Sequence, residues 1–241
     1  MTGASRGIGA ATALAFARQG VRRLTLQYNL NRQGAEETAD AARQLGADAS
    51  IVQADLGDAA CLRQFVASLR GSDFDILVNN AGSLVKRARL PEYTEDLFDR
   101  VMTLNVKSVW EIMQAVTPAM IARGSGIVVN LSSIAARNGG GPGATVYSAA
   151  KAAVTAITKG LAKELAPKGI RVNAVSPGTV DNYFHQQFST REGLAAVAAA
   201  TPAGRLGTNE EVADTIVFLC SDASRFIYGQ TLEVNGGMLM V

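Results

Sequence analysis

The regular alternation of short β-rich runs with longer stretches of helical periodicity constrains the fold of this chain most. We expect strands over residues 24–28, 50–54, 76–79, 127–131, 170–175 and 231–234. Helical spacing occupies residues 35–45, 59–69, 146–166 and 210–219, and one further helix ends near residue 123. Because strands joined through helices need crossover connections, this order predicts a parallel sheet covered on both faces. The expected fold class is α/β, a doubly wound parallel sheet of the Rossmann type in three layers (α/β/α).

Composition narrows the function to small-molecule chemistry. The 241 residues are 48% hydrophobic and contain no repeat, so we expect one domain over 1–241. A net charge of +2 argues against nucleic acid or a membrane as the main partner. Cys61 and Cys220 are too few and too distant for a disulfide framework. With no long apolar run or signal region, the chain is expected to be soluble and cytoplasmic. We expect no metal site.

The chain opens on a glycine-rich turn, Thr2-Gly3-Ala4-Ser5-Arg6-Gly7-Ile8-Gly9. Glycines allow a tight turn and close approach of a ligand, and the helical pattern that follows would point free N–H groups at an anion. The turn therefore predicts a site for a dinucleotide pyrophosphate. Its spacing, G-x3-G-x-G, differs from the commoner G-x-G-x-x-G fingerprint.

Only Met1 precedes this turn, although a buried strand is expected there. Without that strand, its two neighbours in the sheet would be unpaired and apolar surface would be exposed. We therefore expect either that the natural protein begins several residues earlier or that another segment fills the gap.

Polar and glycine residues also follow the other strands, at the sheet edge where such folds bind ligands. Taken in order, the motifs TGASRGIG, ADL, NNAG, LNV, NLSS, YSAAK, SPG and VNGG resemble those of the classical short-chain dehydrogenase/reductase family, near the 3-oxoacyl-(acyl carrier protein) reductases. The resemblance covers the chain from Thr2 to Gly237.

Four residues are the catalytic candidates. Tyr147 and Lys151 lie four positions apart on a predicted helix and so share one face. Reducing a ketone requires a proton donor, and an ammonium about 5 Å away would bring the pKa of a phenol from about 10 to about 8. Ser133 would donate to the substrate carbonyl, with Ser132 as the alternative. The resemblance implies that Asn105 kinks its helix and holds a water leading to the lysine.

The cofactor is expected to be NADPH rather than NADH. Tyr28 stands where an acid would accept hydrogen bonds from an adenosine ribose. The resemblance implies that Arg6 meets a 2′-phosphate there, and Arg32 either joins it or begins a solvated helix and points away. The resemblance extends the cofactor-binding set to Gly3, Ser5, Arg6, Gly7, Ile8, Gly9, Tyr28, Asn29, Arg32, Asp55, Leu56, Asn79, Ala81, Gly82, Tyr147, Lys151, Pro177, Gly178 and Val180. Asn182 replaces the threonine that the family often has, which alters a hydroxyl contact to the cofactor.

Residues 182–203, with the only histidine, His185, are expected to form a lid over the substrate. Basic residues after the NNAG motif, Lys86, Arg87 and Arg89, are either solvated or part of a surface for an acidic carrier. Small residues along the helix that follows Tyr147, together with the resemblance, imply a homotetramer.

The sequence thus indicates an NADPH-dependent carbonyl reductase of ketone or 3-oxoacyl substrates, with Tyr147 as the general acid. One alternative is an NAD(P)-dependent dehydrogenase that oxidises a secondary alcohol or a sugar. The other, of a different class, is a non-catalytic NADP-binding sensor or scaffold.

Overall fold

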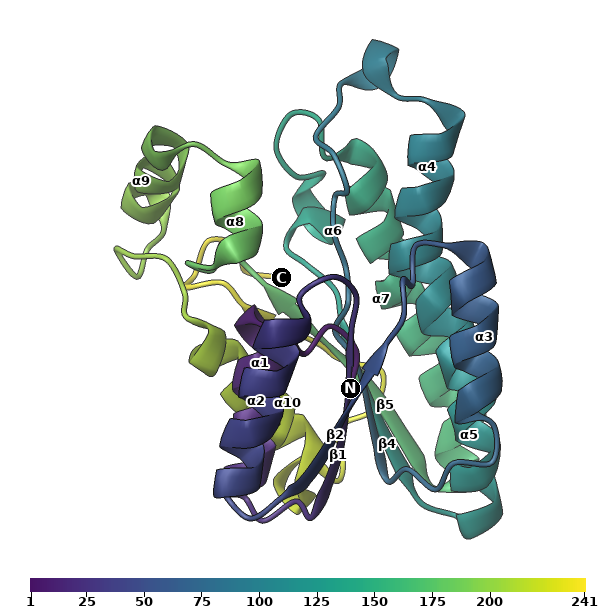
Figure 1. Ribbon diagram of the computed structural model, residues 1–241. Helices are drawn as coiled ribbons and strands as arrows, with labels where there is room; N and C mark the ends of the chain where they lie inside the picture. The colour runs from purple at the N-terminus through teal and green to yellow at the C-terminus, as the bar shows by residue number, and fades with distance from the viewer.

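The computed structural model describes all 241 residues and has the expected order of strands and helices (Figure 1). The strands are β1 (Arg23–Tyr28), β2 (Asp48–Gln53), β3 (Ile76–Asn79), β4 (Gly126–Leu131), β5 (Ile170–Pro177) and β6 (Thr231–Val234). The helices are α1 (Gly7–Arg18), α2 (Arg32–Gln44), α3 (Ala59–Leu69), α4 (Glu95–Met102), α5 (Ser108–Arg123), α6 (Ala135–Asn138), α7 (Thr145–Leu165), α8 (Tyr183–Phe188), α9 (Arg191–Ala200) and α10 (Asn209–Cys220). The predicted α/β class is confirmed.

All strand pairs are parallel, and they form a pair β1-β2 and a set β3-β4-β5-β6. Residues 1–4 lie between the two groups. The Gln27 amide donates to Met1 O at 2.9 Å, and the Thr2 amide donates to Val78 O at 3.0 Å. The first residues of the chain therefore occupy part of the gap that the sequence leaves between β1 and β3.

Helices cover both faces of the sheet, and each face has its own apolar core. Figure 1 shows α1, α2 and α10 on one side of the strands and α3, α5 and α7 on the other. Leu26 and Ile216 are fully buried in the first core, and Met120 and Ile170 are fully buried in the second. None of the helices is both long and apolar enough to span a membrane.

The helix that carries Asn105 departs from regular α geometry. Between α4 and α5 the chain forms a π-helical turn over Thr103–Lys107. Such a turn adds a residue to the helix and is frequent at functional sites. Here it brings the buried Asn105 side chain against the loop that follows β3, where it bonds to Ser83.

Candidate active site

One large cavity, of about 1040 Å³, opens at the carboxyl ends of the strands. Its wall runs from the glycine turn at residues 3–8, past the loop after β3, to α8 and α9. In Figure 1, α8 and α9 lie beside each other, well away from α3 and α5. Ligands of open parallel sheets bind at this edge, so the cavity is the candidate active site.

Ser133, Tyr147 and Lys151 all line this cavity. Ser133 follows β4, and the other two lie one turn apart near the start of α7. The Lys151 Nζ is 5.7 Å from the centroid of the Tyr147 ring and donates to Leu131 O at 2.7 Å. The carbonyl at the end of β4 thus fixes the ammonium below the phenol.

Burial shifts the pKa values of Tyr147 and Lys151 in directions that the sequence did not predict. Enclosure of the phenol raises the pKa of Tyr147 to about 12, although the Ser133 hydroxyl favours the phenolate and offsets part of the rise. Burial also lowers the pKa of Lys151 to about 8, and its side chain is only 3% exposed. The expectation that the lysine holds the phenol near 8 is therefore wrong for the protein without ligands, because desolvation of the buried phenol disfavours its charged form.

Asn105 and Lys151 approach each other across Gly82. A Cβ at Gly82 would lie 2.8 Å from Asn105 Oδ1 and 2.9 Å from Lys151 Nζ. The side-chain Nδ2 of Asn105 donates to Ser83 O at 2.9 Å and to Val101 O at 2.8 Å. Its Oδ1 accepts from the backbone amide of Ser83. Asn105 therefore fastens the loop after β3 beside the lysine. The water that the resemblance assigns to it stays a prediction.

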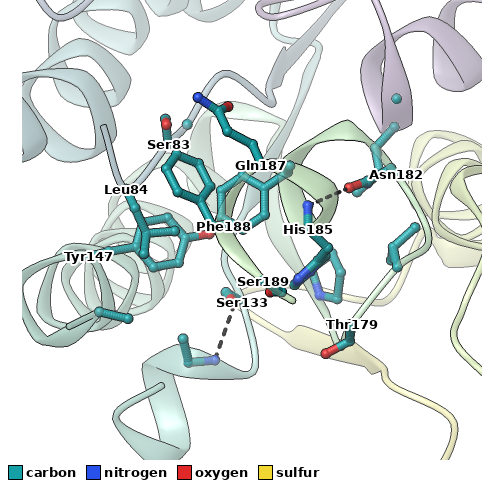
Figure 2. A pocket seen from close by; sticks show the side chains of 18 of the residues that line it. Ser83, Leu84, Ser133, Tyr147, Thr179, Asn182, His185, Gln187, Phe188 and Ser189 are labelled. Carbon is teal, nitrogen blue, oxygen red and sulfur yellow. Dashed lines mark hydrogen bonds between the residues drawn. The ribbon is translucent and has the colours of Figure 1, made fainter. Parts of the chain in front are cut away.

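Ser132 and Ser133 face different surroundings. The Ser132 hydroxyl is buried between Lys151 O, at 3.1 Å, and Thr155 Oγ1, at 2.8 Å. Both serines line the cavity, but Ser133 is less buried, and its hydroxyl accepts from the Ala135 amide at 3.1 Å and leaves its own proton free (Figure 2). The geometry thus favours Ser133 over Ser132 for contact with a substrate carbonyl.

The glycine turn has the donor set and shape for an anion. Gly3 and Gly7 adopt φ values of +65° and +60°, which glycine adopts without strain. No side chain caps the start of α1 at Arg6. Because the first N–H groups of a helix have no partner within it, they are free to bind phosphate oxygens. This turn fits the pyrophosphate of a dinucleotide.

Hydrogen bonds fasten the turn to the neighbouring loops. The Thr2 hydroxyl accepts from the Asn80 and Ala81 amides, and the Asn80 side chain donates to Thr2 O and Gly3 O. On the other side, Gln27 Oε1 accepts from the Gly3 amide at 2.9 Å. Sequence reasoning missed Gln27, although an amide side chain near the carboxyl end of a predicted strand, where ligands of such sheets bind, is a signal for such a role.

Most of the predicted cofactor residues line the cavity. They are Gly3, Ser5, Arg6, Gly7, Ile8, Asn29, Leu56, Ala81, Gly82, Tyr147, Lys151, Pro177, Gly178 and Val180. Five do not: Gly9, Tyr28, Arg32, Asp55 and Asn79.

Each of these five has other contacts. A Cβ at Gly9 would lie 2.2 Å from Gly3 O, so Gly9 lets α1 pack on the turn. Tyr28 and Asn79 are buried within their strands. Arg32 pairs with Glu36 on its own helix, and Asp55 pairs with Arg100.

Arg6, which was expected to meet a 2′-phosphate, packs on an aromatic ring instead. Its guanidinium carbon lies 4.1 Å from the centroid of the Tyr183 ring, so the glycine turn contacts the first residue of α8. Since Arg32 is turned away, Arg6 is the only arginine of the predicted pair that lines the cavity. Sequence reasoning missed Tyr183, because only the folded chain brings it to the turn.

The expected lid consists of α8 and α9, and its first helix carries aromatic side chains into the cavity. Figure 2 shows Phe188, Tyr147 and Leu84 among the side chains that line the cavity. The ring centroids of Phe184 and Tyr147 are 5.8 Å apart. The side chain of Asn182 caps α8 by accepting from the His185 amide at 3.4 Å. Asn182, which stands where the family often has a threonine, thus stabilises the start of this helix.

Comparison with known proteins gives consistent results. A family model described as Enoyl-(Acyl carrier protein) reductase matches residues 3–239. The chain is 37% identical, over 244 residues, to the 3-oxoacyl-[acyl-carrier-protein] reductase FabG of Staphylococcus aureus, with 100% of this chain and 97% of the relative covered.

Two solved structures resemble it over nearly their whole length. A protein from Beutenbergia cavernae, assigned provisionally as an NAD(P) dependent gluconate 5-dehydrogenase and holding NADP at low occupancy, has a TM-score of 0.90 and 36% identity, with 98% of this chain and 94% of that chain covered. The NADH-dependent reductase A1-R′ complexed with NAD has a TM-score of 0.85 and 34% identity, with coverages of 100% and 95%.

Proposed function

Because the chain belongs to the short-chain dehydrogenase/reductase family, we propose that it is an NADPH-dependent carbonyl reductase acting on ketones of the 3-oxoacyl type. One observation carries the proposal. A single cavity joins an uncapped, glycine-lined helix start at one end to Ser133, Tyr147 and Lys151 at the other. The cavity thus offers a phosphate site and a proton donor to one bound pair of cofactor and ketone.

The nicotinamide cofactor, when bound, supplies the hydride. Ser133 donates a hydrogen bond to the ketone oxygen and stabilises the negative charge that develops there. Tyr147 gives its phenolic proton to the same oxygen, and its raised pKa keeps that proton in place at neutral pH. Lys151, held by Leu131 O, stabilises the phenolate left behind. Asn105 positions the loop beside this lysine.

A second candidate is oxidation of a sugar-derived alcohol. The similarity to the Beutenbergia protein favours it, as do the hydroxyl and amide side chains of Asn138, Gln187 and Ser189 on the cavity wall. Single-turnover assays in both directions separate the two. We expect reduction of ketones by NADPH; turnover of alcohols alone would favour the dehydrogenase, and cofactor binding without any turnover would favour a sensor.

The preference for NADPH rests on Arg6. No acidic side chain lines the cavity, so nothing there repels a 2′-phosphate. Arg6 can leave the Tyr183 ring at modest cost, because an exposed cation–π contact contributes only about 0.5–1 kcal/mol. We expect kcat/KM to be higher with NADPH than with NADH, and Arg6→Gln to remove most of that difference. Equal use of both cofactors by the unmodified protein would contradict the preference.

We also propose a cytoplasmic homotetramer. Large apolar side chains are exposed in two separate places: Trp110 on α5 is 42% exposed, and Phe226, just before β6, is 97% exposed. Gly160 of α7 has nothing within 4 Å of the position where a Cβ would lie, so its small size serves no contact inside the chain. The outer edge of β6 is unpaired, which leaves it available to a second copy. Cys61 and Cys220 are both free thiols, in keeping with a reducing compartment.

A further inference from the structure

The charged side chains on the cavity wall are all cations. They are Arg6, Arg87 and Lys151. Arg6 lies at the glycine turn and Lys151 lies below Tyr147, so both belong to the machinery already described. Arg87, in the loop after β3, has no role there.

Arg87 is held rigidly by backbone groups. Its Nε donates to Phe188 O at 3.0 Å and its Nη1 donates to Pro142 O at 2.6 Å. The side chain thus joins α8 to the glycine-rich loop before α7. Its stem lies against Gly143, where a Cβ would come within 2.7 Å of the Arg87 Cγ. The guanidinium therefore has a fixed place at the cavity wall.

The charge of Arg87 has no partner. The side chain forms no ion pair, whereas Arg123 on α5 pairs with Asp73 and Asp75. Nη2 of Arg87 donates none of the hydrogen bonds in the structure, so its two N–H groups remain available. A fixed cation with free donors, in a cavity without acids, is matched to an anion.

His185 lies on α8, three residues before Phe188, whose carbonyl accepts from Arg87. Burial, with a smaller contribution from the charge of Arg87, lowers the pKa of His185 to about 4. The charge of Arg87 therefore acts in the space that the imidazole occupies. At neutral pH the ring is uncharged and supplies one N–H donor beside the cation. Asp181, which acts on the same ring in the opposite direction, does not line the cavity.

We propose that Arg87, assisted by His185, binds an anionic group of the substrate, so that the preferred ketones carry a carboxylate or a phosphate away from the reacting carbonyl. The inference rests on the proposed reductase function and names its substrate class. The aromatic rings of Phe184 and Phe188 would cover the carbon chain between the two polar ends.

Matched pairs of ketones test this proposal. The first pair is 4-oxopentanoate and its methyl ester, which differ in a carboxylate. The second is the acetoacetyl thioester of phosphopantetheine and that of pantetheine, which differ in one phosphate. We expect kcat/KM to be about tenfold or more higher for the anionic member of one pair, as for other hydrogen bonds to charged groups. A preference within the first pair would identify the substrate as an oxo acid, and a preference within the second would identify it as a phosphate-bearing thioester.

Variants of Arg87 test whether this residue causes the preference for the anionic ketone. Arg87→Gln should lower kcat/KM for the anionic member by about tenfold or more and leave the neutral member within about twofold. Arg87→Lys should keep part of the preference, since it keeps the charge but not the planar donors. Lys86→Gln is the matched control: Lys86 is exposed, adjacent and outside the cavity wall, and its loss should leave both members unchanged.

Two results would overturn the inference while the reductase function stands: equal kcat/KM for both members of each pair in the unmodified protein, or an equal loss on both members in Arg87→Gln. The second would mean that Arg87 only holds the loops. If no ketone of either kind is reduced, the proposed function fails and the inference falls with it.

Discussion

Replacing Lys151 by methionine should change how the stability of this protein depends on pH. Methionine has a similar length and no charge, so the substitution removes the buried ammonium and keeps much of the packing. Lys151 has a pKa of about 8 in the folded protein, against 10.5 for a free lysine. The unfolded chain therefore binds more protons than the folded chain between these two values.

The sign and size of the pH effect on stability follow from this difference in bound protons. Where the unfolded state binds more protons, stability rises with pH, so the unmodified protein should gain stability from pH 8 upward. The full difference between the two pKa values corresponds to about 3 kcal/mol, of which about 2 kcal/mol is recovered between pH 7 and 10. Above pH 10 the raised pKa of Tyr147 acts in the opposite direction, so the measurement should stop there.

Equilibrium urea unfolding of both proteins at pH 7, 8, 9 and 10, at one protein concentration, gives the required free energies. Contributions of groups that the substitution leaves unperturbed cancel in the difference between the two proteins, whereas Tyr147, beside Lys151, need not cancel above pH 10. We expect that difference to change by about 2 kcal/mol over the range, in the direction that favours the unmodified protein at high pH. A difference that stays constant within about 0.5 kcal/mol would refute the claim that Lys151 is desolvated.

Three further substitutions have defined outcomes. Gly82→Ala places a methyl group within 2.9 Å of Asn105 Oδ1 and Lys151 Nζ, so steady-state kinetics should show kcat reduced about tenfold or more with the circular dichroism spectrum unchanged. The Cβ of Gly160→Leu meets no other atom of its own chain within 4 Å, so the substitution should leave the protein folded but, in size-exclusion chromatography with light scattering, smaller than the expected tetramer; an unchanged tetramer would refute that interface. Arg171→Met removes four hydrogen bonds to Leu219, Ser221 and Ser224 in a buried place and should cost about 3 kcal/mol in urea unfolding; a loss below about 1 kcal/mol would contradict this reading.

The sequence predicted the six strands and the long helices within a few residues, because apolar runs with helical stretches between them leave few other arrangements, but it did not predict helices α6, α8 and α9. The strand at 76–79 and the helix at 59–69 have the predicted bounds. The π-helical turn around Asn105 was expected only as a kink, since its geometry depends on contacts with the loop after β3.

The site was predictable where a residue follows a strand or shares a helix face, as Ser133, Tyr147 and Lys151 do. It was not predictable where tertiary contacts decide the direction of a side chain. Arg32 follows β1 as expected, yet it turns to Glu36 on its own helix. The pKa of Tyr147 depends on how far the fold excludes water from the phenol, and no spacing in the sequence reports that.

The central claim is that Tyr147 supplies the proton in ketone reduction. Tyr147→Phe keeps the ring that packs against Phe184 and removes only the hydroxyl. In single-turnover reduction of a ketone by NADPH, we expect the mutant to bind the cofactor with unchanged affinity and to reduce the ketone at least about a hundredfold more slowly, the usual contribution of a general acid. Reduction of the ketone at the same rate by both proteins would contradict the account.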